Sequence, residues 1–295
     1  MEMRRPPPVC LLDALSSEVD AMLYLERRPH PALAPYIKLL WYCRYPDAPH
    51  QRQIILPTGH LQVVISLTEN QLTDCTREPG TSSQSQPFSV LVGIHSHYQV
   101  IDSADLAHLI GILFHPGGTI PFFSPFTHLF TNLEASLEDI WGSSANALRD
   151  RLREASTPDT KFDALEAALL GRLARAHTPA RNPLIDFSLN LLHASPGTAT
   201  IAALARTTGL SPRRLSQLFR EQVGVSPKLY CRIQRFQQAV QQLHRGVDLP
   251  WSELALSCGY YDQSHFANDF RAFSGISPTT YSTASRPWSN HIALD

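Results

Sequence analysis

The sequence lacks a cysteine framework and a long apolar run. Its five cysteines are scattered along the chain and include no Cys-x-x-Cys pair, which argues against a set of disulfide bonds and against a structural zinc site. No apolar stretch approaches the roughly 18 residues that a membrane span requires. The basic, proline-rich start is followed by an apolar stretch that Asp13 and Ser16 interrupt, so we expect neither a signal peptide nor a membrane anchor. These absences predict a soluble, cytoplasmic protein with no membrane partner.

Signatures of several enzyme classes are also missing. The sequence contains neither a Gly-x-Ser-x-Gly nucleophile elbow nor a His-Glu-x-x-His zinc motif. No Gly-Lys-Ser or Gly-Lys-Thr follows Gly117 and Gly118, so a tight turn explains these glycines better than a phosphate loop. His95 and His97 are spaced to share one face of a strand and His115 follows a later strand, but no carboxylate completes a set of metal ligands. We predict no enzyme, no metal and no cofactor.

The net charge of −1 hides a difference between the two parts of the chain. Residues 1–180 hold 14 Lys and Arg against 19 Asp and Glu, which is −5, whereas residues 181–295 hold 11 against 7, which is +4. A length of 295 residues suits two domains. A basic module joined to an acidic one is typical of a DNA-binding domain attached to something else.

What the sequence does contain is a pattern that occurs twice in its C-terminal third. Leu204, Ala205, Gly209 and Leu210 recur at an offset of 50 as Leu254, Ala255, Gly259 and Tyr260. A second set recurs at an offset of 51: Ser211, Leu215, Phe219, Gly224, Val225, Ser226, Pro227 and Tyr230 become Asp262, Phe266, Phe270, Gly275, Ile276, Ser277, Pro278 and Tyr281. A fixed period marks a repeated supersecondary unit. A short helix, a glycine turn and a capped amphipathic helix together predict a helix-turn-helix, the common device for entering the major groove of DNA.

The second helix of the first unit has two different faces. Ser211 caps it and Pro212 occupies its first position, where a missing N–H costs nothing. Leu215, Leu218 and Phe219 form a stripe that faces a core. At about 100° per residue, the opposite stripe carries Arg213, Ser216, Gln217 and Arg220. Arginine can bind guanine and glutamine can bind adenine in the major groove, whereas Arg214 at the flank is better placed for a phosphate.

The second unit and the helix between the units are read in the same way. Asp262 caps a helix whose buried stripe contains Phe266, Phe270 and Phe273. Its outward residues are Ser264, Ala267, Asn268 and Arg271, with Gln263 and His265 at the edges. The alternative is that this face is mostly structural. The joining helix carries Lys228, Arg232 and Arg235 on its polar side. Residues 211–236 have a net charge of +5 and residues 251–281 have −2, so we predict that the first unit dominates affinity for DNA.

The N-terminal part has a different pattern of apolar and polar residues. Short apolar runs bounded by Pro, Gly, Asn and His predict strands of a sandwich or barrel at residues 37–42, 53–56, 61–67, 88–93 and 109–114. The chain becomes helical from about residue 133 to 176. The predicted fold is α+β with two domains, divided into a flexible N-terminus (1–20), a β-rich domain with a helical tail (21–176), a linker (177–183), a tandem helix-turn-helix domain (184–285) and a tail (286–295).

The C-terminal motifs resemble the AraC/XylS family of bacterial transcription regulators over about one hundred residues, from Pro183 to Tyr281. The matching motifs run from Leu204 to Tyr230 and from Leu254 to Tyr281, including Cys-Gly-Tyr-Tyr-Asp-Gln-Ser-His-Phe at residues 258–266. The resemblance implies that a long helix joins two units that enter successive major-groove segments of double-stranded DNA. It implies base contacts by Arg213, Ser216, Gln217, Gln263, Ser264 and Asn268. The phosphate candidates are Arg214, Arg220, Lys228, Arg232, Arg235, His265 and Arg271.

The N-terminal part resembles the sensory domain of one branch of that family, a cupin-like β-barrel followed by helices. The motifs that carry this resemblance are Leu-Pro-Thr-Gly at 56–59, Phe-His-Pro-Gly-Gly at 114–118 and Leu-Glu-Asp-Ile-Trp-Gly at 137–142, with Thr58 where the family commonly has Asp. We expect a small-molecule effector here, bound by aromatic residues such as Trp41, Tyr42, Phe88, Tyr98 and Phe114. RNA polymerase would be a partner if the protein is an activator, and the helices between residues 145 and 176 are either a dimer surface or packed on the barrel.

Two alternatives stay open at this stage. A cupin-like metalloenzyme or a DNA-repair protein could carry the same DNA-binding module, although Cys10, Cys43 and Cys75 lack the spacing of a reactive zinc cluster. A regulator without a ligand, whose barrel binds only another protein, is the other alternative.

Overall fold

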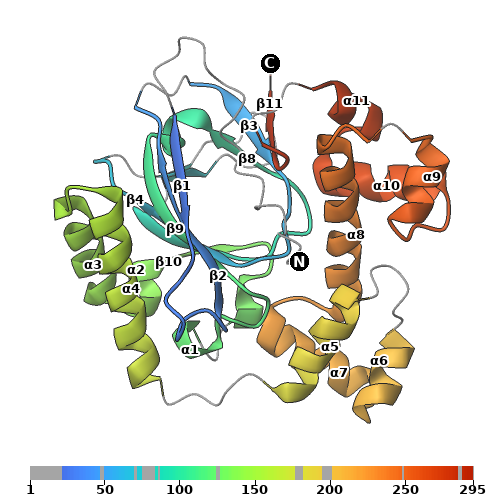
Figure 1. Ribbon diagram of the computed structural model, residues 1–295, viewed down its shortest axis with the longest axis horizontal. Helices are drawn as coiled ribbons and strands as arrows, with labels where there is room; N and C mark the ends of the chain where they lie inside the picture. The colour runs from blue at the N-terminus through green and yellow to red at the C-terminus, as the bar shows by residue number, and fades with distance from the viewer. Residues whose placement is uncertain are drawn as a thin grey trace, which may run out of the picture.

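The computed structural model describes residues 22–46, 50–69, 72–74, 84–85, 87–123, 127–176, 182–194, 201–247, 249–284 and 288–294. The N-terminus predicted to be flexible and most of the predicted linker lie outside these residues. A β-rich part and a helical part lie side by side, as the sequence predicts (Figure 1). The α+β fold class is therefore confirmed.

The β-rich part is built from two antiparallel sheets. The larger has the strand order β1-β2-β9-β4-β7-β10, with bounds Leu23–Arg27, Ile37–Arg44, His108–Phe114, Gln62–Ser66, Ser89–Val92 and Glu134–Ser136. The smaller has the order β11-β3-β8, with bounds His291–Ala293, Arg52–Ile55 and Gln99–Asp102. Two further short strands, β5 (Thr73–Asp74) and β6 (Gln84–Ser85), pair antiparallel with each other. The five predicted apolar runs correspond to β2, β3, β4, β7 and β9.

Alternation along β2 divides the side chains between two cores. Leu40 and Tyr42 belong to the large hydrophobic core, whereas Trp41 and Cys43 belong to a small cluster with Leu106 and Leu109. Successive residues of a strand point to opposite faces of the sheet, which explains the division.

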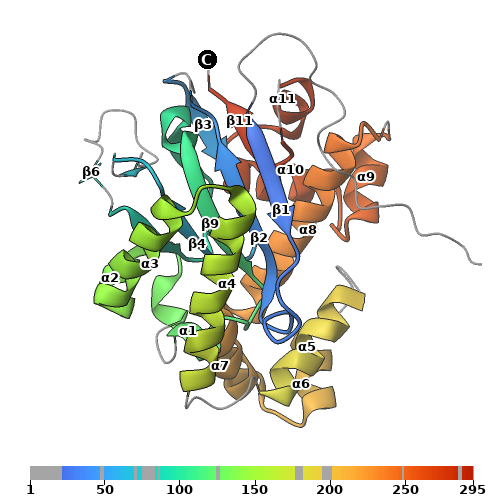
Figure 2. The same ribbon diagram turned by 60° about the vertical axis from the view of Figure 1, so that its left-hand side comes forward.

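Short helices and two longer ones cover the larger sheet on one side (Figure 2). They are α1 (Ile120–Phe123), α2 (Leu137–Trp141), α3 (Ser143–Glu154) and α4 (Pro158–Arg175). Two 3-10 turns, η1 (Ser103–Leu106) and η2 (Thr127–Phe130), precede β9 and β10. Leu165 and Leu169 of α4 are fully buried, and Leu170 and Leu173 pack against the same core. The apolar face of α4 therefore lies against the domain.

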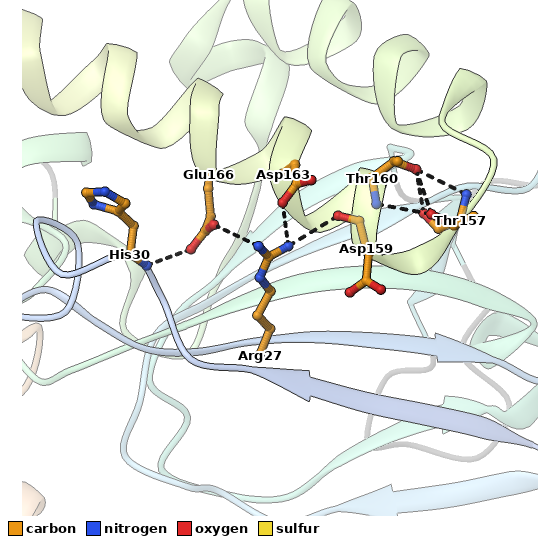
Figure 3. A network of polar contacts seen from close by, with 7 residues as sticks. All are labelled: Arg27, His30, Thr157, Asp159, Thr160, Asp163 and Glu166. Carbon is orange, nitrogen blue, oxygen red and sulfur yellow. Dashed lines mark hydrogen bonds and ion pairs between the residues drawn. The ribbon is translucent and has the colours of Figure 1, made fainter.

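An ion-pair network attaches α4 to the first strand (Figure 3). The Arg27 guanidinium lies 2.7 Å from a carboxylate oxygen of Asp163 and 3.6 Å from one of Glu166. The other carboxylate oxygen of Glu166 accepts a hydrogen bond from the backbone N–H of His30 at 2.6 Å. The Thr157 hydroxyl caps the start of α4 by accepting from the N–H of Thr160. These contacts set the position of α4 on the sheet.

The helical part contains the two predicted units. Its helices are α5 (Pro183–Ala194), α6 (Ile201–Thr208), α7 (Pro212–Val223), α8 (Pro227–His244), α9 (Trp251–Ser257), α10 (Gln263–Ser274) and α11 (Pro278–Thr283). In Figure 1, α8 runs along one side of the β-rich part, referred to below as the barrel, with α5–α7 near one end and α9–α11 near the other. None of the helices in the described ranges has the length and apolar character to cross a membrane.

Turn glycines and helix caps repeat between the units as predicted. Gly224 and Gly275 end α7 and α10 in the left-handed conformation, with φ of 100° and 78°. Side chains of Ser211 and Asp262 accept hydrogen bonds from the N–H three residues on, at 3.2 and 2.7 Å. Glycine adopts positive φ without steric cost, so each recognition helix ends at a defined residue.

The end of the described chain returns to the barrel. Residues 286–295, predicted to be a tail beyond both domains, contain β11, which pairs antiparallel with β3 and places Ile292 opposite Ile54. Ile292 is only 3% exposed and lies in the large core. A segment that follows the helical part in sequence is thus a strand of a sheet in the β-rich part.

Candidate nucleic-acid interface

The helix α7 presents its predicted polar stripe to solvent. Leu215 and Phe219 are fully buried on the opposite side and Leu218 is nearly so. Arg213 and Gln217 are exposed, and Ser216 is half-buried between them. The amide of Gln217 donates to the carboxylate of Glu221 at 2.8 Å, one turn further along the helix. The three predicted base-contacting residues therefore lie together on one accessible face.

The helix α10 repeats this arrangement. Phe266, Phe270 and Phe273 are buried, and they pack on one another and on Phe236 of α8 through ring contacts of 5.1–5.7 Å. The predicted base contacts on the other side are all exposed: Gln263, Ser264 and Asn268. His265 is exposed as well, and its ring meets that of Tyr260 edge-on at 5.3 Å.

Two predicted phosphate contacts, Arg232 and Arg235, bind other residues of the protein. A carboxylate oxygen of Asp269, which is buried, lies 2.6 Å from Nη2 of Arg232. Nη1 of Arg235 donates to the carbonyl of Gly259 at 3.1 Å, and its guanidinium lies 5.0 Å from the centre of the Tyr260 ring. Both guanidinium groups thus join α8 to the second unit. The periodicity of α8 identified their face but not the elements that pack against it.

The remaining phosphate candidates are accessible. Arg214 and Arg220 on α7, Lys228 at the start of α8 and Arg271 on α10 are all exposed. Three of these four cations belong to the first unit and its junction with α8, and Glu221 is the one acidic residue of α7. The accessible positive charge is therefore concentrated around the first unit, as the charge count predicts.

The barrel contacts the helical part away from both polar stripes. The Thr131 hydroxyl donates to the carbonyl of Gly224 at the end of α7, and a side-chain carbon added at Gly275 would collide with the ring of Tyr98. Gln237 in the middle of α8 donates from Nε2 to the carbonyl of Pro57 at 2.8 Å. The barrel therefore holds the joining helix and the equivalent turn of each unit. No local sequence pattern could reveal these contacts, because their partners are about 90 to 180 residues apart.

The aromatic residues predicted to bind an effector do not converge on one place. Tyr42 and Phe114 lie in the large core, and Trp41 lies on the opposite face of the same strand. Phe88 packs under the guanidinium of Arg149 at 3.9 Å. Tyr98 contacts the second unit at Gly275. The structure thus brings Tyr42 and Phe114 into one core, with Tyr98 packed against it, and places Trp41 and Phe88 elsewhere.

The histidines at the end of the strand β7 form a stacked pair. The rings of His95 and His97 are 5.9 Å apart and nearly parallel. His95 is 9% exposed, and neither of its ring nitrogens has a hydrogen-bond partner within the described part of the chain. Burial, with a smaller effect of His97, lowers the pKa of His95 to about 4. The described residues contain no group of three or more His, Cys, Asp and Glu side chains that could hold a metal ion.

Family models match a segment in each of the two parts of the chain. A family model described as a helix-turn-helix domain matches residues 204–284. A second model, described as a domain of unknown function (DUF6597), matches residues 25–136.

The chain is similar to individual proteins over part of its length. The chain is 31% identical over 161 residues to the arabinose operon regulatory protein of Escherichia coli K12, covering 53% of this chain and 54% of that protein. It is 32% identical over 111 residues to the HTH-type transcriptional activator RhaR of Yersinia pestis, covering 37% and 38%. A crystal structure of a probable AraC family transcriptional regulator from Rhodopseudomonas palustris is 29% identical, with a TM-score of 0.30, and covers 33% of this chain and 92% of that one.

The chain spans about half, or less, of the length of the curated relatives it matches. The repeated unit, its turn glycines and caps, and the helix-turn-helix match all lie in the same region. Residues 204–284 therefore form a helix-turn-helix domain, and over part of its length the chain is similar to regulators of the AraC/XylS family.

Proposed function

We propose that the protein is a sequence-specific transcription regulator whose two helix-turn-helix units bind successive major-groove segments of double-stranded DNA. The observation that carries this proposal is the pair of equivalent helices, α7 and α10, each with an exposed polar stripe and a buried apolar one. The repeated caps and glycine turns give both helices the same local geometry. The similarity to known transcription regulators favours a regulator over an enzyme.

Selection of genomic fragments with the purified full-length protein, followed by footprinting of the selected DNA, tests this function. We expect protection of two segments about one helical turn apart, roughly 34 Å. The genes beside the selected sites would then indicate what the protein regulates. Enrichment no greater than for random DNA, with and without cell extract as a source of effector, would contradict the proposal.

Replacement of Arg213 by alanine is expected to weaken operator binding by about 1–3 kcal/mol, with the loss confined to one base position. Asn268→Ala should have a smaller effect, because the accessible positive charge lies around α7 and supports its contacts. Equilibrium binding to a series of single-base operator variants measures both effects. Arg245→Ala, at an exposed position beyond α8, is the matched control. Equal losses for Arg213→Ala and Asn268→Ala would contradict the ranking of the two units.

Lys228 and Arg235 lie two turns apart on α8 but should behave differently. Lys228→Ala is expected to reduce the slope of log affinity against log salt by about 1, because an exposed cation that neutralises a phosphate releases a counterion. Arg235→Ala should leave that slope unchanged and instead lower the melting temperature, because its guanidinium bonds to Gly259 and covers Tyr260. Affinity titrations from 50 to 300 mM salt and thermal melts of both variants test the distinction. If Arg235→Ala also reduced the slope of log affinity against log salt, Arg235 would be shown to contact DNA.

An effector is part of the proposal for the β-rich domain. A buried imidazole without a hydrogen-bond partner is costly, and a polar group of a bound molecule can remove that cost. His95 is such a group, and the same loop carries Tyr98, which contacts the second unit at Gly275. A molecule bound at His95 could therefore change how the barrel holds that unit, provided that it binds the two arrangements with different affinity. A thermal-shift screen of small molecules on wild type and His95→Phe tests this proposal, which predicts compounds that stabilise only the wild type.

Further partners are proposed from the resemblance to the AraC/XylS family alone. We propose RNA polymerase as a partner if the protein activates transcription, and a homodimer as the assembly. The apolar face of α4 packs against its own domain, so a dimer would have to use another surface. Sedimentation of the free protein and of its operator complex would give the number of copies.

A further inference from the structure

The second unit contains one residue that the first does not. In the first unit Leu210 is followed directly by the helix cap Ser211. In the second, Tyr260 occupies the place of Leu210, and Tyr261 then precedes the cap Asp262. This insertion is the step from an offset of 50 to one of 51. Tyr261 is 86% exposed, whereas Tyr260 beside it is 3% exposed.

The residues around Tyr261 fix where its side chain begins. Tyr260 packs against the rings of Phe266 and His265, each at 5.3 Å. The Asp262 carboxylate accepts a hydrogen bond from the N–H of His265 at 2.7 Å and so caps α10. Tyr261 lies between these two anchored residues. Its ring is therefore held at the N-terminal end of α10, next to the predicted base contacts Gln263 and Ser264, and not within the core.

Single exposed apolar residues are common and need no special explanation. Leu256 on α9, at 62% exposed, is such a residue. Tyr261 differs in its position, because the N-terminal end of a recognition helix is the end that meets base edges in the groove. It also differs in chemistry, since a phenol hydroxyl is among the side-chain groups that bind phosphate oxygens.

The charges of the second unit strengthen the argument. Arg271 is the one accessible cation of α10, and Asp262 and Glu253 are both exposed. Asp269 is already paired with Arg232. Attraction to phosphates is therefore weak here, and neutral groups must supply most of the contacts that hold α10 on DNA.

We propose that Tyr261 is a DNA-positioning residue of the second unit, whose hydroxyl donates a hydrogen bond to a phosphate oxygen while its ring packs against the adjoining sugar. This inference rests on the proposed function and names a contact within it. Because the residue is neutral, its contribution adds affinity without adding to the salt dependence. Because the contact is to the backbone, it positions α10 and does not itself distinguish bases.

The test compares Tyr261→Phe, Tyr261→Ala and the control Leu256→Ala in the full-length protein on the footprinted operator. Hydrogen bonds to charged groups are worth enough for Tyr261→Phe to weaken binding about tenfold. Tyr261→Ala should weaken it further, and Leu256→Ala should bind like the wild type. The salt slope should be unchanged in all three, and the loss should be the same for every single-base operator variant. Footprinting should show weaker protection of the second segment with the first retained.

Other outcomes overturn the inference. Wild-type affinity for both tyrosine variants would show that the ring is only a solvated surface residue. A loss confined to one base pair would make Tyr261 a base contact and not a backbone contact. Thermal melts exclude misfolding as the cause, since an 86% exposed side chain should not affect the melting temperature. A protein for which Arg213→Ala has no effect and no operator is found would instead overturn the proposed function.

Discussion

Deletion of residues 288–295 is expected to lower the free energy of unfolding by about 4 kcal/mol and to loosen the helical part from the barrel. Burial of one large aliphatic side chain is worth about 1.5–3 kcal/mol, and Ile292 is almost fully buried in the core. Each intramolecular hydrogen bond adds about 0.5–1.5 kcal/mol. Denaturant unfolding measures the loss, and limited proteolysis near residues 177–181 measures the loosening.

The contacts of this segment explain why its removal affects both parts. The backbone N–H of Leu56 donates to the carbonyl of Asn290, and that of Leu294 donates to the carbonyl of Arg52, at 2.9 and 2.8 Å. On the helical side, Gln237 donates to the side-chain oxygen of Asn290 at 2.9 Å. The segment therefore bridges β3 and α8, so that the two parts share one stabilising element.

Point variants distinguish the contribution of the buried Ile292 side chain from that of the rest of the segment. Ile292→Ala should cost about 2 kcal/mol, the lower end for buried aliphatic truncations, and less than the deletion, because the backbone hydrogen bonds of β11 are retained. Leu256→Ala removes an exposed side chain of similar size and should cost less than 0.5 kcal/mol. Unchanged stability of both the truncated protein and Ile292→Ala would mean that β11 is not a stable part of the sheet.

The sequence predicts the repeated helical part better than the sheet. Caps such as Ser211, turn residues such as Gly224 and apolar stripes are local signals, and the structure contains them at the predicted residues. The strand β11 has only three residues and its partner is more than 230 residues away in sequence. No periodicity can develop in so short a strand, and pairing between distant segments leaves no local mark, so it could not be predicted.

The candidate site also combines features that local sequence signals predict with features that depend on packing between distant segments. Helical periodicity correctly places Arg213 and Asn268 on exposed faces. It does not say that Asp269 would engage Arg232, because that pairing depends on how α10 packs against α8. Trp41 and Tyr42 are a different case: as neighbours on a strand they must face opposite sides, so the sequence alone argues against placing both in one effector site.

Acidification from pH 6.5 to 4 is expected to destabilise the protein strongly, because several histidines are held neutral in the fold. Burial is the first cause in each case, and it lowers the pKa of His60 to about 3 and those of His95, His108 and His291 to about 4. In the unfolded chain a histidine has a pKa near 6.5. Between these values the unfolded chain binds protons that the folded chain does not, so stability falls as the pH is lowered.

His95 offers the clearest test of this linkage, since its imidazole is almost inaccessible and has no hydrogen-bond partner in the described chain. A difference of one pKa unit corresponds to about 1.4 kcal/mol, so a group of this kind contributes roughly 3 kcal/mol at most to the acid-induced loss. His95→Phe should therefore flatten the dependence of unfolding free energy on pH between 6.5 and 4, while leaving it unchanged above pH 7. His30→Asn, at an exposed histidine, should retain the wild-type dependence. If His95→Phe lost stability on acidification as steeply as the wild type, the imidazole would be accessible to protons in the folded protein, and its burial would have to be transient.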